Sequence, residues 1–142
     1  MKMPRKISAG VITYLHPDHL SSPRFGTDSA KNVVWQWQDL AFGVAAPTGS
    51  VTVALRYPGQ YHEAETGLFQ NWNRTYDKAS GRYLESDPVG LSAGNNTYLY
   101  AFGSPFSEID LDGKSADIPL TPPSFFALTT TSGLQANTTL EQ

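Results

Sequence analysis

The chain contains no cysteine, and several other features are missing as well. Without cysteine it has no disulfides, no thiolate metal sites and no cysteine nucleophile. No apolar run reaches the roughly 18–20 residues that a membrane helix needs, and the first residues lack the apolar h-region of a signal peptide. The ten Lys and Arg residues are scattered through a chain of net charge −3, so no basic patch would attract nucleic acid. We therefore expect no nucleic-acid partner, and a protein that is cytoplasmic as synthesised unless a dedicated secretion system exports it.

Turn-forming and aromatic residues are plentiful. The 142 residues include 12 Gly, 10 Pro, seven Phe, seven Tyr and three Trp. This balance favours short strands joined by tight turns over long helices. The length suits a single hydrophobic core. The composition predicts an all-β fold of short antiparallel strands and hairpins, followed by an irregular C-terminal tail.

Several short runs have the apolar and β-branched character of strands. In residues 32–38, Val33, Trp35 and Trp37 fall on one face. We expect these two tryptophans and Trp72 to pack in the core or between repeats, although exposed aromatic rings can also stack on single-stranded nucleic acid or sugars. The expected strands are 10–15, 32–38, 50–57, 70–76 and 96–102, and Val51, Val53, Leu55 and Tyr57 should share one face.

One short motif occurs twice. Residues 63–69 (EAETGLF) and 77–83 (DKASGRY) both have an acidic residue, then Thr or Ser, Gly, and an aromatic residue two positions later. Such a repeat is typical of a β-hairpin used twice. Gly67 and Gly81 are then expected at turn positions that favour positive φ.

A second pair of similar motifs is DPVGL at 87–91 and DLDGK at 110–114, separated by eighteen residues (92–109). Pro88, Gly90 and Gly113 are typical turn residues. Asp87 and Asp110 have two interpretations. Each carboxylate could cap its own turn, or the two could lie together, share a proton and act as general base and acid.

Histidine is scarce, and the sequence HPDH at 16–19 contains residue types that bind metals. Only His62 remains as a further histidine, and Pro17 favours a loop at this point, so a structural or solvent-exposed role is the alternative. The sequence GKS at 113–115 lacks the earlier glycine that a phosphate-binding loop requires. We expect no metal and no cofactor.

The repeated hairpin followed by DPVGL carries a resemblance to a known family. Residues 61–114 closely resemble the Rhs repeat-associated core of Rhs and YD-repeat proteins, and residues 14–43 look like the YD-type repeat that precedes this core. The resemblance implies four regions: an N-terminal segment 1–13, a YD-type repeat region 14–60, the core 61–114, and a variable Pro- and Thr-rich tail 115–142.

The resemblance also implies a function. In this family, arrays of β-hairpins wind into a hollow cage around a toxic C-terminal polypeptide, and the core closes one end of the cage. Many members cut their own chain by aspartyl-protease-like chemistry at a second Asp-Pro-x-Gly-Leu motif. On that pattern Asp87 and Asp110 would form the carboxylate pair, and the cut would fall between Lys114 and Ser115. The second motif here lacks the Pro and the final Leu of the pattern.

Three interpretations remain open. The first is a shell or interaction module that stacks on further Rhs or YD β-repeats, on its own copies or on a larger complex, with an exposed edge at the first strand, 10–15. The second is a self-cleaving, single-turnover aspartyl autoprotease. In the third, residues 115–142 form a partner-binding arm, because this segment is too short for a folded toxin enzyme.

Overall fold

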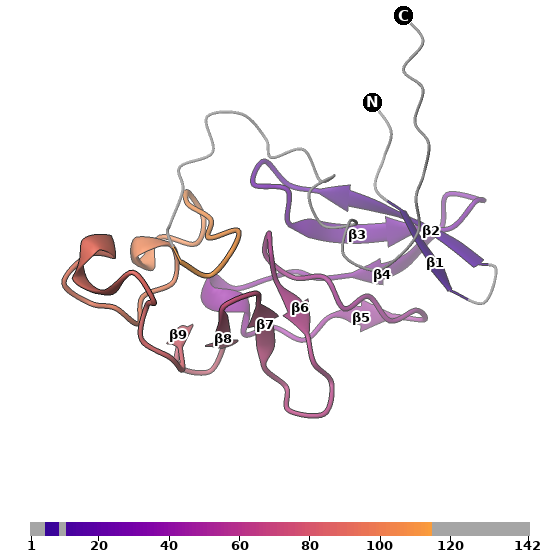
Figure 1. Ribbon diagram of the computed structural model, residues 1–142. Coiled ribbons are helices and arrows are strands. Elements are labelled where there is room, and N and C mark those ends of the chain that lie inside the picture. The colour runs from indigo at the N-terminus through magenta and orange to yellow at the C-terminus, as the bar shows by residue number, and fades with distance from the viewer. Residues whose placement is uncertain (1–4, 9–10, 115–142) are drawn as a thin grey trace, which may run out of the picture.

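The structure is a computed structural model that describes residues 5–8 and 11–114. Within these residues the chain forms nine short β-strands and three 3₁₀ turns, without an α-helix. The predicted all-β fold is therefore confirmed. Figure 1 shows that the strands follow one another across the molecule in the order of the sequence, from a larger sheet at one end to a group of turns at the other.

The first sheet is antiparallel, and each strand pairs with its neighbours in sequence. The prediction that 10–15 forms the exposed edge is wrong, because this run lies inside the sheet and the preceding strand pairs with it. Facing residues on these two strands include Ile7 and Ile12. The edge strand of the sheet is therefore the preceding strand, Arg5–Ser8. The strands are β1 (Arg5–Ser8), β2 (Val11–Pro17), β3 (Pro23–Thr27), β4 (Val33–Gln36) and β5 (Thr48–Gly49).

The second sheet consists of the repeated hairpin. Gly67 lies in the turn between β6 and β7, and Gly81 lies in the turn between β8 and β9. Their φ angles are +75° and +68°, in the left-handed region that glycine adopts without a steric penalty. The strands are β6 (Tyr61–His62), β7 (Phe69–Asn71), β8 (Arg74–Asp77) and β9 (Arg82–Tyr83).

Three of the five predicted strands, 50–57, 70–76 and 96–102, do not form as single strands. Residues 70–76 do not form one strand, because the chain reverses between β7 and β8 and Asn71 pairs with Arg74. Trp72 occupies this turn with φ +50° and is 60% exposed, so it does not lie in the core. Packing between repeats, the other place predicted for Trp72, stays a prediction. Residues 96–102 contribute only a single bridge, between Arg82 and Leu99.

Aromatic side chains from both sheets form one core. Trp35 and Trp37 are buried as predicted, whereas Val33 of the same predicted face is exposed. The run 50–57 is irregular, with one bridge from Leu55 to Tyr61, yet all four apolar side chains expected on its inner face lie in or against the core. The core residues are Leu15, Trp35, Trp37, Val53, Tyr57, Phe69, Tyr76, Tyr83, Tyr100 and Ala101.

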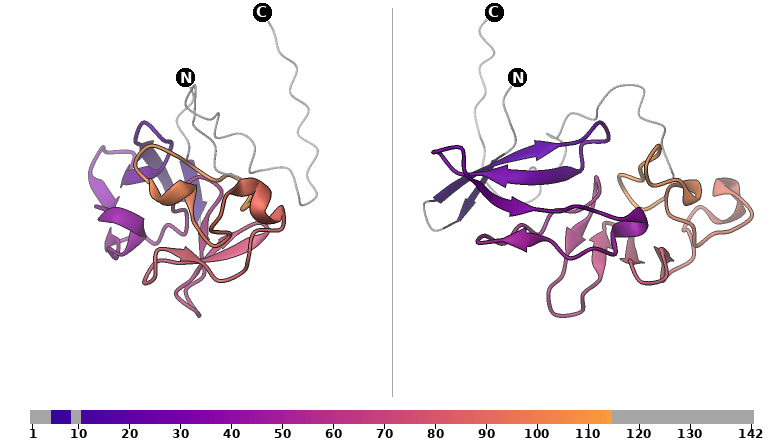
Figure 2. Two further views of the ribbon diagram at one scale, coloured as in Figure 1. Left: turned by 90° about the vertical axis from the view of Figure 1, so that its left-hand side faces the viewer. Right: turned by 180° about the vertical axis from the view of Figure 1, so that it is seen from behind.

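Three 3₁₀ turns connect or follow the strands. They are η1 (Ala41–Gly43), η2 (Gly90–Ala93) and η3 (Ala101–Gly103). Seen from behind in Figure 2, η2 and η3 lie at the end of the molecule opposite to β1 and β2. Over the described stretches 5–8 and 11–114, we find no helix with the length and apolar character needed to cross a membrane.

Candidate functional site

The polar site at the C-terminal end of the fold is built around Arg74. This residue lies on β8 two positions before Tyr76, and residues two apart on a strand point to the same face. Tyr76 is fully buried, and Arg74 is only 3% exposed. A buried guanidinium needs anionic or carbonyl partners, and the turns that follow β9 supply them.

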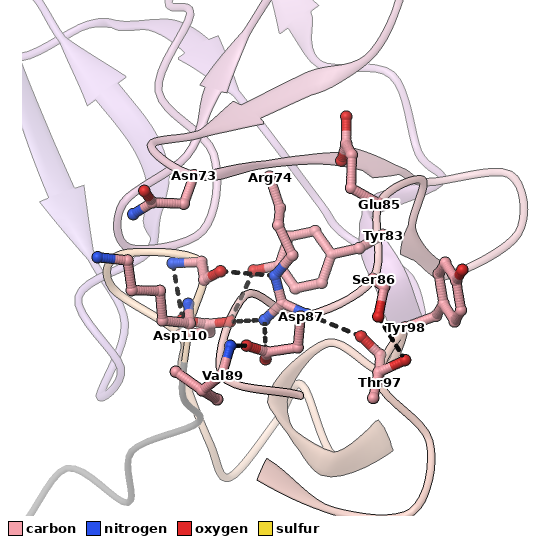
Figure 3. A network of polar contacts seen from close by, with 12 residues as sticks. Asn73, Arg74, Tyr83, Glu85, Ser86, Asp87, Val89, Thr97, Tyr98 and Asp110 are labelled. Carbon is pink, nitrogen blue, oxygen red and sulfur yellow. Dashed lines mark hydrogen bonds and ion pairs between the residues drawn. The ribbon is translucent and has the colours of Figure 1, made fainter. Parts of the chain in front are cut away.

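Arg74 holds both predicted carboxylates. One of its nitrogens, Nη2, is 2.9 Å from Oδ2 of Asp87 and 2.9 Å from Oδ2 of Asp110. The two carboxylate oxygens are therefore no farther apart than twice this distance. The structure thus brings Asp87 and Asp110 together, with the guanidinium as their common partner (Figure 3).

Asp87 also organises its own turn. Its Oδ1 accepts a hydrogen bond of 2.9 Å from the Val89 N–H, and its carbonyl accepts one of 2.9 Å from the Gly90 N–H. Gly90 has φ +64°. The backbone N–H of Asp87 donates to the Thr97 carbonyl at 2.8 Å, so one carboxylate both shapes the DPVGL turn and contacts Arg74.

Asp110 does the same for the second turn. Its Oδ1 accepts hydrogen bonds from the Gly113 N–H at 2.8 Å and from the Lys114 N–H at 3.2 Å. Arg74 Nε donates to the Gly113 carbonyl at 2.6 Å. A Cβ at Gly113 would lie 2.4 Å from the Asn71 carbonyl oxygen, so only glycine allows this close approach. The DLDGK turn is therefore fastened to the β7–β8 hairpin.

A layer of neutral side chains supports these charges. The Tyr83 hydroxyl donates to Asp110 Oδ2 at 2.9 Å and accepts from Asn71 Nδ2 at 2.6 Å. The Arg74 guanidinium lies 3.7 Å from the centre of the Tyr83 ring, at cation–π distance. Asn71 also donates to the Asp110 carbonyl at 2.9 Å. Residues from β7, β8 and β9 thus fix both Asp110 and Arg74.

The electrostatics differ from those of a proton-sharing carboxylate pair. Burial raises the pKa of Asp110, and the hydrogen bond from Tyr83 and the charge of Arg74 oppose this rise without cancelling it. Burial likewise raises the pKa of the Tyr83 hydroxyl, so this group stays a neutral donor. In this arrangement each carboxylate contacts the same nitrogen of the guanidinium, so a cation is their common partner.

A cavity of about 270 Å³ opens beside the three charged groups. Its wall is formed by Arg74, Asp87 and Asp110 together with residues 94–96, Leu99 and Phe102. Lys114 lies next to Asp110 through its backbone N–H. The other residue of the predicted cleavage bond, Ser115, lies outside the described residues, as does the tail 115–142.

The histidines have separate partners. His16 Nε2 is hydrogen-bonded to the Thr27 hydroxyl at 3.0 Å, and the His16 ring stacks on Phe25. His19 Nε2 is hydrogen-bonded to the Phe106 carbonyl at 3.0 Å. Where the structure describes the chain, no three His, Asp or Glu side chains gather in a way that could hold a metal ion.

Sequence reasoning identified the two aspartates but missed Arg74, Tyr83 and Asn71. The signal available for Arg74 was its spacing from Tyr76, which places a charged residue on the inward face of a strand. Because residues 70–76 were predicted as one strand, the turn at Trp72 and the separate strand that begins at Arg74 were not recognised. Asn71 and Arg74 reach Asp110 and Gly113 across separations of 36–39 residues, which local patterns do not encode.

No family model matches the chain. It is 38% identical over 120 residues to the double-stranded DNA deaminase toxin A of Burkholderia cenocepacia (strain H111), covering 80% of this chain and 8% of that protein. It is 36% identical over 103 residues to the toxin protein Tse5 of Pseudomonas aeruginosa, covering 72% of this chain and 8% of that protein. A shorter match, 41% identical over 46 residues, is to the probable deoxyribonuclease RhsA of Dickeya dadantii (strain 3937), covering 32% of this chain and 3% of that protein. The chain therefore spans less than a tenth of the length of these relatives.

The fold also matches a solved structure. The crystal structure of TcdB2-TccC3 superposes with a TM-score of 0.67 at 27% sequence identity, over 78% of this chain and 6% of that chain. The all-β architecture and the repeated hairpin of this chain are consistent with its similarity to these relatives. The chain therefore belongs to the Rhs proteins, as an Rhs core-like segment.

Proposed function

We propose that the chain is the closing segment of a β-hairpin shell and that further β-repeats pair with its β1 edge. The main observation for this proposal is the difference between the two ends of the fold. Among the described residues, no strand pairs with the outer side of β1 at one end, and at the other end the chain is fastened to its own core. A segment with this polarity continues a sheet on one side and terminates it on the other.

The open end is β1. It is the edge strand of the five-stranded sheet and has four residues, whereas the other edge strands, β5, β6 and β9, have two each. Ile7 on β1 is 61% exposed. A longer edge strand with an exposed apolar residue is suited to pairing with another strand.

The closed end is the turn around Asp110 and Gly113. Arg74 holds both residues, and all three of these groups lie in the buried network. The solved relative TcdB2-TccC3 is named for two components. This supports protein partners for the present chain as well.

The test measures pairing at β1. The partner is Tse5 from which the residues matching this chain have been deleted, and binding is measured by surface plasmon resonance. We expect the chain to bind and Ile7→Lys to weaken binding roughly tenfold or more, because a charge on an edge strand opposes pairing.

Val33→Lys is the matched control. Val33 is 60% exposed, almost the same as Ile7, but it lies on β4, which is paired on both sides. It should bind like the unmodified chain. If the chain does not bind the truncated partner, or if both lysine variants weaken binding equally, β1 is not the docking edge.

A second candidate function is single-turnover self-cleavage next to Lys114. The observation that favours it is the convergence of Asp87 and Asp110 beside the Lys114 backbone. A carboxyl with a raised pKa can act as a proton donor, and Asp110 has one. For cleavage, a water molecule would have to reach the carboxylates from the adjoining cavity and Arg74 would have to release one of them.

Intact-mass measurement after long incubation tests this candidate. Self-cleavage predicts two fragments that meet between Lys114 and Ser115, and predicts that Asp87→Asn and Asp110→Asn each stop it. Asp112→Asn is the control, because within residues 5–8 and 11–114 no contact joins Asp112 to Arg74, and its carboxylate accepts the local Lys114 N–H. A chain that stays intact at its full mass of 15.5 kDa rules the candidate out.

A further inference from the structure

The sequence Ala-Phe-Gly occurs twice, and both copies form a 3₁₀ turn in which the phenylalanine has a positive φ. They are η1 (Ala41–Gly43) and η3 (Ala101–Gly103). Phe42 has φ +69° and Phe102 has φ +49°, and the following glycines have φ +80° and +79°. A phenylalanine in the left-handed region is uncommon and strained. The two turns share this geometry at Phe and Gly, and they differ at alanine, because Ala101 also has a positive φ (+46°) and Ala41 does not.

The first of these turns is covered by another part of the chain. The turn of the β8–β9 hairpin lies on the Phe42 ring, because a Cβ at Gly81 would be 3.1 Å from the ring atom Cγ of Phe42. On its other side Gly43 faces the core, where a Cβ would lie 2.9 Å from Cε2 of Phe69. The glycine of a hairpin turn is therefore the natural partner of this phenylalanine.

The second turn has no such cover in the described part of the chain. Phe102 is 53% exposed. A Cβ at Gly103 would meet nothing within 4 Å, whereas Gly43 faces an aromatic ring. The positive φ of the phenylalanine is thus retained at η3, where the half-exposed Phe102 borders the cavity beside Arg74.

The hairpin repeat provides the matching surface. Gly67 is the counterpart of Gly81 in the repeated motif, with a similar φ, but a Cβ at Gly67 would meet nothing within 4 Å. The chain therefore has one filled pair, Phe42 with Gly81, and one unfilled half of each kind, Phe102 and Gly67. Phe102 and Gly67 do not contact each other within one copy, because nothing lies within 4 Å of a Cβ placed at Gly67.

Charge favours the same pairing. The Gly67 turn carries Glu63 and the exposed Glu65. A cavity of about 270 Å³ reaches from Phe42 to Gly103, and its charged lining residues are Lys78 and Arg82, with no acidic side chain. On the Gly103 side of η3, an acidic hairpin turn would meet these basic side chains.

We propose that a second copy of this chain is the partner: Phe102 of one copy packs on the Gly67 turn of the next, as Phe42 packs on Gly81 within each copy. The contact joins two different surfaces, so it extends head to tail and does not close by two-fold symmetry. It is separate from the pairing proposed for β1, and neither proposal depends on the other.

Sedimentation velocity of the full chain, from roughly micromolar to millimolar concentration, measures this association. Gly67→Asn places a side chain where the neighbouring ring would lie, and asparagine tolerates the left-handed backbone. Gly90→Asn is its control, because Gly90 has φ +64° and equally open space. Phe102→Asn removes the ring, and Phe106→Asn is its control, because both phenylalanines are 53% exposed.

We expect the unmodified chain and both controls to associate with increasing concentration. Gly67→Asn and Phe102→Asn should each associate roughly tenfold or more weakly. An equimolar mixture of these two variants should form a dimer and no larger species, because each retains the surface that the other has lost. A chain that is monomeric throughout, variants that associate as well as their controls, or a mixture without a dimer would overturn the proposal. Ile7→Lys should leave this association unchanged, which separates it from the β1 interface.

Discussion

At the scale of single residues, Arg74 is the group on which the closed end of the fold depends. Its side chain contacts Asp87, Asp110 and two backbone carbonyls, of Thr97 and Gly113, while almost fully buried. Removing one member of a buried ionic network leaves the remaining charges buried without a partner. The free energy lost in this way is larger than the net stabilisation that the intact network provides. We therefore expect substitution of Arg74 to lower the stability of the folded chain.

We expect Arg74→Met to lower the free energy of unfolding by about 3–5 kcal/mol, because two carboxylates stay buried without their cation. Arg74→Lys should recover only part of this, since an ammonium cannot donate in the same fork geometry. The triple variant Arg74→Met, Asp87→Asn, Asp110→Asn should recover a further part by removing the charges. Urea denaturation measures all three. If Arg74→Met and Arg74→Lys are equally stable, neither the positive charge nor the fork geometry of the guanidinium stabilises the turn at 110–114.

Asp39 is a second buried carboxyl, and it makes stability depend on pH. Its side chain accepts a hydrogen bond from the Tyr57 hydroxyl, and burial raises its pKa above 3.8. The folded state therefore keeps a proton that the unfolded state has already lost. Its contribution to stability is complete below pH 3.8, declines as pH rises through the raised pKa, and is constant above it.

Asp39→Asn imitates the protonated form at every pH. We expect the variant to gain stability relative to the unmodified chain as pH rises from about 4 to 7. The measurement is the free energy of unfolding in urea at several pH values for both proteins. Asp110, whose pKa is also raised, is common to both and cancels in the comparison. A difference that does not change with pH would show that Asp39 titrates normally in the folded state.

At the scale of secondary-structure elements, the two copies of the hairpin differ in what their turns touch. Gly67 and Gly81 have similar positive φ angles, so alanine should be strained by about 1 kcal/mol at either position. At Gly81 the added methyl would also press on the Phe42 ring, whereas at Gly67 it would enter open space.

Gly81→Ala should therefore destabilise the protein by about 1–3 kcal/mol more than Gly67→Ala, the usual range for overpacking. Thermal or urea unfolding of the two variants measures this difference. Equal losses would mean that Phe42 moves aside freely, and would also weaken the template on which the Phe102–Gly67 contact is based.

These elements show why the sequence predicted some parts and not others. The hairpin turns were predictable because glycine at a fixed place in a repeated motif has a local backbone cause. The reversal at Trp72 was not, because a bulky residue with φ +50° contradicts the local preferences on which a strand prediction depends. Asp87 and Asp110 were predictable from their motifs, whereas their common partner Arg74 was fixed only by packing between distant parts of the chain.

At the scale of the whole molecule, order in sequence and order in space coincide. In both sheets every strand pairs with the strand next to it along the chain. The aromatic core and the Arg74 network join parts of the chain that are far apart in sequence. The predicted all-β class needed only composition and turns, but the closure of the fold depends on these distant contacts.

This arrangement has a mechanical consequence. A pulling force applied at the N-terminal side of β1 would separate β1 from β2 one residue pair at a time, because nothing pairs with the outer side of β1 in the described residues. A force applied at Lys114 would first meet the part-buried hydrogen bond from Lys114 to Asp110 and the buried hydrogen bond from Arg74 to Gly113. We therefore expect the molecule to unfold at a lower force when it is pulled from β1 than when it is pulled from Lys114.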